Sequence, residues 1–353
     1  MGNFNRSPSG TGFGELARLS YPCDLTMRTP TNTPSAPLMI RLPNWVGDVC
    51  MSLPVLTLCR ELGVEVAVSG RPWAADLLAG LPLAAVLPMR GRLREDIATL
   101  RAWRGAHADY QRALLLPDSL STALAFRLAG FRSAGYRDDG RSLLLSWGFS
   151  KPPGPLHAVQ SWHHLACSAL RAWGYDTGRA RLDARLGLPL TAQHLQDTEH
   201  LMQQAHLSAG QFVLIAPTAT GRHKGQIKVW PHFDTLTRAL QSQGIRVVAC
   251  PPPSEQDAAR LSAPTAQVLP PLGLGAYCAL ARQAALVICN DSGVSHLCAA
   301  VGARQLTLFG VTDPGRTGPW TPDSTNLGQN GHWPDAHSVI ARASGLLQSE
   351  RLQ

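Results

Sequence analysis

The chain has 353 residues, 44% of them hydrophobic, and a formal net charge of +8 at pH 7. This length exceeds what one hydrophobic core usually organises, so we expect two domains. The charge suits a protein that meets anions such as nucleic acid, acidic lipid headgroups or phosphorylated small molecules, but arginines scattered over the surface would give the same value. No apolar stretch approaches the ~18 residues of a membrane span, and the N-terminus lacks the apolar core of a secretory signal, which predicts a cytoplasmic protein.

The eight cysteines include no Cys-x-x-Cys pair and lie mostly in apolar runs. Buried free thiols in a reducing compartment explain them better than disulfides or zinc ligands. No His, Asp or Glu cluster has metal-ligand spacing, and no Asp-x-Asp stands near a strand end. We therefore expect neither a metal nor another cofactor.

Residues 1–37 are rich in Gly, Ser, Thr, Asn and Pro, and we predict a disordered arm there. Strands and helices then alternate in two series, separated by a polar, helical bridge at about 152–210. The first series has predicted strands at 38–43, 65–70, 84–89 and 112–117, and helices at 45–62, 73–78, 93–103 and 119–128. The second has predicted strands at 211–217, 245–250, 285–290 and 305–310, and helices at 232–243, 276–284 and 295–301.

Alternating strands and helices predict parallel sheets built from βαβ units. The two series indicate an α/β protein with two doubly wound domains, at 38–180 and 181–335, and a C-terminal helix at 336–353. Because such sheets bind ligands at the carboxyl ends of their strands, the candidate site residues are those that follow each strand.

The first strand is followed by "PNWVGDVCMSLP", which places Gly47 and Asp48 at or near the start of a helix. Helix capping alone would account for Asp48. A glycine before it would also let a second molecule approach the backbone. Asp48 is thus a candidate carboxylate base that faces the cleft.

The strand ending at Pro217 is followed by "TATGRHKGQIKVWP", which contains Thr218, Thr220, Lys224 and Lys228. The whole chain has only three lysines, and two of them lie in this loop. Hydroxyls, a glycine turn and two compact ammonium groups make a candidate phosphate cradle. A polar surface loop is the alternative.

The strand ending at Asn290 is followed by "DSGVSHLCAA". Asp291, Ser292 and Gly293 precede a helix whose free N–H groups and dipole attract phosphate, and His296 lies in its first turn. Capping by Asp291 and Ser292, with a packed histidine, is the alternative. The loop after the last strand, "TDPGRTGPW", adds Thr312 and Arg316 as secondary candidates, although its Gly and Pro content also fits a simple turn.

Two common nucleotide motifs are missing. The first strand is not followed by Gly-x-Gly-x-x-Gly, which argues against a dinucleotide oxidoreductase, and no P-loop occurs. The phosphate charge would then be met by lysine and a helix terminus.

Together, "NWVGDVCMSLPVL", "TATGRHKGQIKVWPHFDTL", "ICNDSGVSHLCAAVGARQLTLFG" and "TDPGRTGPW" resemble the lipopolysaccharide heptosyltransferases of glycosyltransferase family 9. The resemblance extends from about residue 38 to 320. The first of these strings is more similar to the enzymes that add the second heptose than to those that add the first.

This resemblance implies a GT-B fold, in which two Rossmann-like domains enclose the active site. It further implies inverting, metal-independent transfer of heptose from ADP-heptose to the lipid-linked Kdo/heptose inner core of lipopolysaccharide. Asp48 would match the general base, and Thr218, Thr220 and Lys228 the residues near the donor phosphates. Residues 291–293 and His296 would match the donor-binding loop and helix, while Lys224 would share the phosphate contact.

Three other interpretations stay open at this stage. The chain could use a different nucleotide sugar, as a transferase or an epimerase. It could instead be a non-catalytic basic module that binds nucleotides or nucleic acid, although no nucleic-acid motif is present and we expect no nucleic-acid partner. A lipid-linked acceptor would also imply peripheral contact with the inner membrane.

Overall fold

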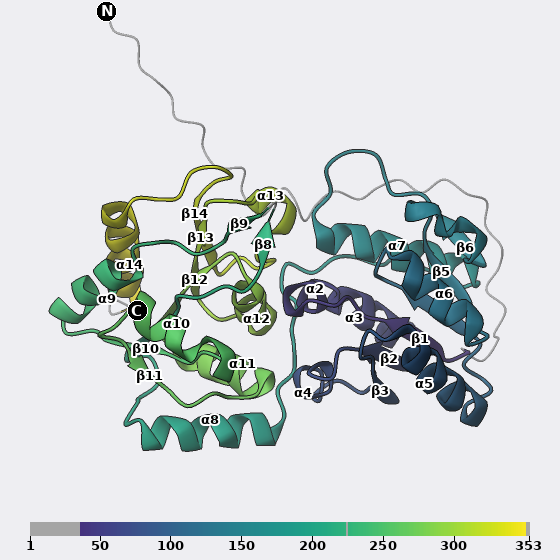
Figure 1. Cartoon of the computed structure of the whole chain (residues 1–353), viewed down its shortest axis with the longest axis horizontal. Coiled ribbons are helices and arrows are strands. Elements are labelled where there is room, and N and C mark those ends of the chain that lie inside the picture. The colour runs from purple at the N-terminus through teal and green to yellow at the C-terminus, as the bar shows by residue number, and fades with distance from the viewer. Residues whose placement is uncertain (1–35, 224, 351–353) are drawn as a thin grey trace, which may run out of the picture.

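The computed structural model describes residues 36–223 and 225–350. Lys224 and nearly all of the predicted disordered arm lie outside the described residues. In the described part of the chain, two six-stranded parallel sheets, each flanked by helices, lie side by side and meet near the middle of the molecule (Figure 1). The doubly wound α/β prediction is confirmed.

The N-terminal sheet has the strand order β3-β2-β1-β4-β5-β6. Its strands are β1 (Leu38–Arg41), β2 (Val66–Gly70), β3 (Ala85–Pro88), β4 (Arg112–Leu115), β5 (Arg132–Tyr136) and β6 (Trp147–Phe149). The helices of this half are α2 (Val46–Met51), α3 (Leu53–Glu61), α4 (Ala74–Leu77), α5 (Leu93–Ala106), α6 (Leu120–Leu128), the 3-10 helix η1 (Asp138–Leu143) and α7 (Ala158–Ala172).

The C-terminal sheet has the strand order β11-β10-β7-β12-β13-β14. Its strands are β7 (Phe212–Ala216), β10 (Arg246–Ala249), β11 (Gln267–Val268), β12 (Leu286–Asn290), β13 (Gln305–Phe309) and β14 (Ser324–Gly328). The helices of this half are α8 (Ala192–Gln204), α9 (Phe233–Ser242), the 3-10 helix η2 (Pro253–Glu255), α10 (Gln256–Ser262), α11 (Leu274–Gln283), α12 (Gly293–Val301), α13 (Pro314–Thr317) and α14 (Ala336–Glu350).

The burial of the central strands explains why the sequence predicts them clearly. Every residue of β1, β7, β12 and β13 is buried, as expected for strands covered on both faces by helices. The strand order reverses beside β1 in one sheet and beside β7 in the other. Ligands of open α/β sheets bind at such switch points, and the loops that follow β1, β7 and β12 hold most of the candidate residues.

Some local predictions were wrong or incomplete. The single helix expected at 45–62 is two helices, α2 and α3, which meet at Ser52. Pro54 explains the break, because proline lacks an N–H and its ring clashes with the carbonyl four residues earlier. The polar bridge contains two separate helices, α7 and α8, and the lysine-bearing loop forms a short hairpin of β8 (Arg222–His223) and β9 (Gln226–Ile227).

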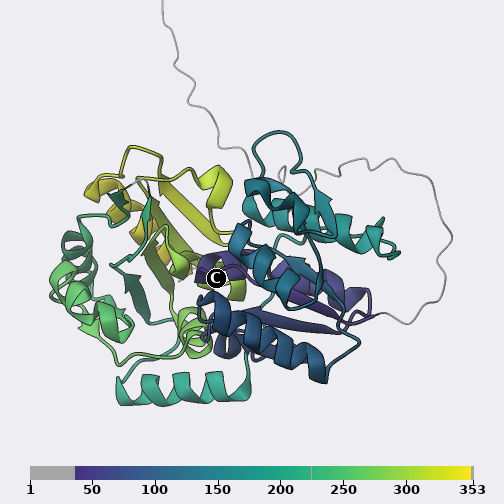
Figure 2. The ribbon, with the colours of Figure 1, turned by 45° about the vertical axis from the view of Figure 1, so that its right-hand side comes forward.

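The two halves meet where α2 packs against α12, and Figures 1 and 2 both show these helices at the centre of the molecule. One cluster of buried apolar side chains continues from β1 through this contact into α11 and α12. Seven cysteines lie in the described residues, and all are free thiols. None of the described helices has both the length and the apolar character that crossing a membrane requires.

Candidate active site

Asp48 lies in the first turn of α2, at the contact between the N-terminal half and the C-terminal half. The preceding loop is held by Arg41, whose buried guanidinium donates to the Asn44 side chain over 2.6 Å and to the Ser69 carbonyl over 3.3 Å. Asp48 is the third residue of α2, and the cap position belongs to Trp45. Its carboxylate is therefore free of the capping role that the sequence left open.

Burial raises the pKa of Asp48 from 3.8 to about 6, and the nearby positive charge of Lys228 acts in the opposite direction. Lys228 comes from the other half of the chain, on the segment between β9 and α9. The structure thus brings together an acidic side chain and a basic side chain that are 180 residues apart. A carboxylate with a pKa near 6 is mostly ionised at neutral pH, yet basic enough to accept a proton.

Lys228 does not stand alone as a cation. Its Nζ lies 2.7 Å from Oδ2 of Asp291, whose side chain is only 4% exposed. The Thr312 hydroxyl donates to the same carboxylate oxygen. The residues that follow β12 and β13 therefore converge on Lys228, and within the chain the ammonium group is already paired with one carboxylate.

Asn290 is a positioning residue that sequence analysis did not single out. Its side chain is fully buried and accepts from the Trp230 backbone N–H over 2.9 Å, while its amide donates to the Ala216 carbonyl over 3.3 Å. The Trp230 indole donates in turn to the Pro334 carbonyl over 2.8 Å. These bonds fix the segment that presents Lys228 against the ends of β7 and β12. The sequence feature that could have identified Asn290 is its position as a polar residue at the end of an otherwise apolar strand.

The start of α12 lies directly against the start of α2. Ser292 is the N-cap of α12, and its hydroxyl accepts from the Val294 N–H over 3.4 Å. Ser292 therefore has the capping role that the sequence offered as an alternative. Gly293 packs against Val46, and a Cβ on Gly47 would lie 2.5 Å from Cδ2 of His296. The close approach that Gly47 permits is thus made by a histidine of the other half.

His296 is 5% exposed, and burial lowers its pKa to about 4, so the ring is neutral at pH 7. Its Nδ1 is buried and has no hydrogen-bond partner among the described residues. An unpaired buried ring nitrogen is costly unless a ligand or solvent satisfies it. Together with the free N–H groups of the first turn of α12, it marks this helix terminus as the polar end of the site.

The remaining candidates divide into two groups. Thr218 joins the strand-end cluster, where its hydroxyl donates to Glu255 of η2, an acidic residue that sequence analysis missed. Thr220 is exposed, and Arg316 is exposed on α13. Neither contacts the Lys228–Asp291 pair by a hydrogen bond or ion pair within the described ranges.

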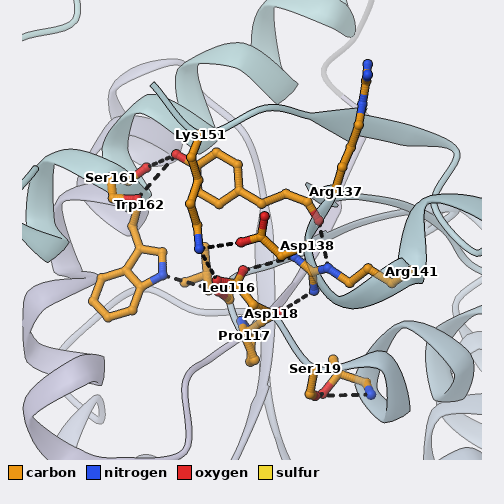
Figure 3. Close-up of polar contacts among 12 residues, drawn as sticks. Leu116, Pro117, Asp118, Ser119, Arg137, Asp138, Arg141, Lys151, Ser161 and Trp162 are labelled. Carbon is orange, nitrogen blue, oxygen red and sulfur yellow. Dashed lines mark hydrogen bonds and ion pairs between the residues drawn. The ribbon is translucent and has the colours of Figure 1, made fainter. Parts of the chain in front are cut away.

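A second polar cluster lies at the carboxyl ends of β4 and β5 (Figure 3). The buried guanidinium of Arg141 donates to Asp118 over 3.0 Å and to the Tyr136 carbonyl over 2.7 Å. Lys151, the third lysine of the chain, lies 2.7 Å from Asp118 and also pairs with Asp138. Burial lowers the pKa of Lys151, but the hydrogen bonds to both carboxylates outweigh this and raise it. Two cations and two carboxylates neutralise each other here, so the cluster fixes the loops that follow β4 and β5.

No group of three or more His, Cys, Asp or Glu residues within the described chain has an arrangement that could hold a metal ion. The groups gathered where the two halves meet are a carboxylate from the N-terminal half, an ammonium–carboxylate pair, threonine hydroxyls and a helix N-terminus. This set can accept a proton on one side and bind an anion on the other. Two Rossmann-like domains with such a site between them have the architecture of the GT-B class.

Comparison with known proteins agrees with this class. The model of glycosyltransferase family 9 (heptosyltransferase) matches residues 100–342. Lipooligosaccharide heptosyltransferase 2 of Haemophilus influenzae is 26% identical over 318 residues, which cover 82% of this chain and 87% of that one. Lipopolysaccharide heptosyltransferase 1 of Escherichia coli is 30% identical over 294 residues, which cover 77% and 87%. A solved E. coli heptosyltransferase with ADP superposes with a TM-score of 0.68 at 22% identity, covering 88% of this chain and 99% of that one.

The chain belongs to glycosyltransferase family 9, and it is a glycosyltransferase with the GT-B fold. The family resemblance read from the four sequence strings is confirmed. Family membership favours a transferase over the epimerase and the nucleic-acid-binding module.

Proposed function

We propose that this enzyme transfers a heptose from ADP-heptose to the inner core of lipopolysaccharide, with inversion at the anomeric carbon. The names of its relatives support the sugar and the acceptor, and the ADP held by one solved relative supports the donor. The observation that carries the mechanism is the pKa of Asp48, raised to about 6 beside Lys228 of the opposite half.

Inversion requires an acceptor hydroxyl to attack the anomeric carbon from the face opposite the leaving diphosphate. Asp48 is the general base in this proposal: as the new glycosidic bond forms, it accepts the hydroxyl proton. The bond from the anomeric carbon to the diphosphate breaks, and its electron pair leaves with ADP. General-base assistance of this kind typically contributes about 10²–10⁴ in rate.

The charge that develops on ADP is met by Lys228 and the N-terminus of α12. Lys228 is 2.7 Å from Asp291, so a diphosphate would share the ammonium group with that carboxylate rather than meet a free cation. The N–H groups at the start of α12 supply further donors. In this proposal no metal ion takes part, and full activity in the presence of a chelator is the expected result.

The acceptor would be lipid-linked, and we propose that the enzyme meets it at the cytoplasmic face of the inner membrane. The net charge of +8 supports attraction to an anionic membrane surface. Binding to anionic vesicles that weakens as salt is raised would agree with this, and equal binding to neutral vesicles would not.

Two measurements on the purified enzyme test the proposal. Thermal shift with a set of nucleotides should show stabilisation by ADP and not by UDP or GDP. Asp48→Ala should bind ADP nearly as wild type, because the donor groups lie in the other half, while transfer falls at least about a hundredfold. Near-normal turnover of Asp48→Ala would remove it from the base role. Selective stabilisation by UDP would instead overturn the donor assignment.

A further inference from the structure

The two halves of the chain also make a polar contact away from the α2–α12 interface. It joins α4 of the N-terminal half to α8 and α11 of the C-terminal half, which lie next to one another in Figure 1. Oδ2 of Asp76 accepts from the Gly275 N–H over 3.1 Å, and Oδ1 lies 3.2 Å from Nε2 of His194. A side chain of one domain thus caps a helix of the other.

The geometry around this contact is specific. Nδ1 of His194 accepts from the Thr191 N–H over 3.3 Å, so in the neutral ring the proton is on Nε2, which donates to Asp76. The ring is 4% exposed. A Cβ on Gly275 would lie 2.2 Å from Cε1 of His194, and a Cβ on Gly273 would lie 2.8 Å from Oδ2 of Asp76. Both glycines are therefore needed for the approach of the two side chains.

The contact lies at an edge where it can set the angle between the domains. Helix α4 follows β2, so it starts at the same carboxyl edge of the sheet as α2 and Asp48. Helix α11 packs against α12, whose N-terminal end carries the N-cap Ser292 and His296. The central contact between α2 and α12 is largely apolar, and glycines let the two helices approach closely. Apolar packing does not by itself fix the angle between two packed elements. Hydrogen bonds at a flank supply the direction that such a contact lacks.

We propose that Asp76 is a positioning residue for transfer, which holds the N-terminal half at the angle that brings Asp48 to Lys228. Its side chain is 43% exposed, so the contact lies at the solvent-facing edge of the interface between the two halves. The kinetic part of this inference rests on the proposed function, whereas the structural part does not.

The test compares Asp76→Ala with Asp335→Ala. Asp335 is a matched control, because it also caps a helix, accepting from the Ser338 N–H over 2.9 Å, but entirely within the C-terminal half. Both variants lose one helix cap, so both should lose similar thermal stability. Only Asp76→Ala should enlarge the radius of gyration measured by X-ray scattering. Its kcat should fall about three- to tenfold, while calorimetry gives a Kd for ADP within about twofold of wild type.

A conservative variant and a steric variant separate positioning from simple loss of stability. Asp76→Asn keeps an oxygen for the Gly275 N–H but turns an amide toward His194, so its kcat should lie between those of wild type and Asp76→Ala. Gly275→Ala keeps every charge and displaces His194, and it should lower kcat in the same direction.

The outcomes are distinguishable. Unchanged scattering and kcat in Asp76→Ala, relative to Asp335→Ala, would overturn the proposal. A larger radius of gyration with wild-type kcat would show that the contact does not position the site. A lower kcat with an unchanged radius of gyration would mean that Asp76 does not act by setting the angle between the halves. If the enzyme transfers no heptose at all, scattering still tests the contact while the proposed function fails separately.

Discussion

At the residue scale, the chemistry depends on how burial changes two side chains. Burial raises the pKa of Asp48 to about 6 and lowers that of His296 to about 4. At neutral pH the candidate site therefore holds an ionised carboxylate and an uncharged imidazole. Lys228 is tied to Asp291, so the positive charge that the lysine-bearing loop led us to expect is an ion pair rather than an isolated cation.

The pH profile of turnover should report Asp48. Because only the ionised carboxylate can accept the hydroxyl proton, kcat/KM should fall as pH is lowered through about 6, approaching tenfold per pH unit at lower pH. Steady-state rates at fixed ionic strength measure this. A profile that stays flat down to pH 5 would contradict a base with this pKa.

The same shift predicts a stability change in Asp48→Asn. Folding raises the pKa of Asp48 from 3.8, so the folded protein holds this proton more tightly than the unfolded chain does. The cost of burying the charge grows as pH rises from 3.8 to about 6 and is complete above that. Asp48→Asn should therefore be more stable than wild type near pH 7.5, by roughly 1–3 kcal/mol. The difference should vanish near pH 4 in denaturant titrations, and a variant equally stabilised at both pH values would contradict the cause.

The Lys228–Asp291 pair should show strong coupling. Lys228→Met leaves a buried carboxylate without its cation and should cost about 2–4 kcal/mol of unfolding free energy. Asp291→Asn added to Lys228→Met removes the unpaired charge, so the double variant should be more stable than Lys228→Met alone. Chemical denaturation of the wild type, Lys228→Met, Asp291→Asn and the double variant completes the cycle. Additive losses of unfolding free energy would show that the two side chains do not interact.

At the scale of elements, three strand ends build the site, and Asn290 joins two of them to the lysine-bearing segment. It binds the end of β7 through Ala216 and holds the Trp230 N–H. Because Trp230 lies two residues after Lys228, a change at Asn290 is transmitted along the backbone to the ammonium group. The strand ends thus fix the positions of the loops, and the loops carry the side chains proposed to contact the substrates.

Asn290→Ala should weaken donor binding although the side chain is fully buried. It leaves two backbone carbonyls and one N–H without their partner, which costs about 1–3 kcal/mol of stability. The freed Lys228 segment should lower ADP affinity, measured by calorimetry below the unfolding transition. Thr237→Val is a suitable control, because Thr237 is also fully buried but lies on α9. Equal losses of ADP affinity in both variants would indicate general destabilisation.

The sequence predicts these elements well where burial is periodic or continuous, and poorly where contacts are distant. Strands β1, β7, β12 and β13 were predicted because every residue in them is buried, and Asp48, Thr218 and Asp291 followed from their strand ends. Strands β5, β6, β11 and β14 were missed, since all contain polar or glycine residues and lie at or next to a sheet edge. Asp76 and Gly275 are 199 residues apart, and a contact between such distant residues cannot be predicted from the local sequence pattern.

At the scale of the whole molecule, the proposed function depends on how the two halves are placed relative to each other. Asp48 belongs to one sheet, while Lys228, Asp291 and the α12 terminus belong to the other. The apolar cluster that crosses the interface favours close packing, and Gly47 sets how close that packing is. The proposed site therefore exists only while the two halves are in contact.

Gly47→Ala should therefore disrupt transfer without touching any charged group. The added Cβ would lie 2.5 Å from Cδ2 of His296, a distance that side chains essentially never adopt, so either the buried His296 ring or the spacing of α2 and α12 must shift. Displacing Asp48 by about 1 Å from its productive position should lower kcat by about a hundredfold. Affinity for ADP should change much less, since the proposed donor contacts lie in the other half. Calorimetry and steady-state kinetics on the same preparation measure both quantities.

Gly105→Ala is the matched control for Gly47→Ala, because Gly105 also lies within a helix, α5, but a Cβ there would meet no atom within 4 Å. Helix propensity predicts that this substitution is neutral or stabilising, by up to about 1 kcal/mol. If both alanine variants keep wild-type kcat, the α2–α12 spacing does not govern the reaction. If Gly47→Ala loses ADP affinity as strongly as turnover, the disturbance reaches the donor side through His296, and the assignment of separate roles to the two halves is wrong.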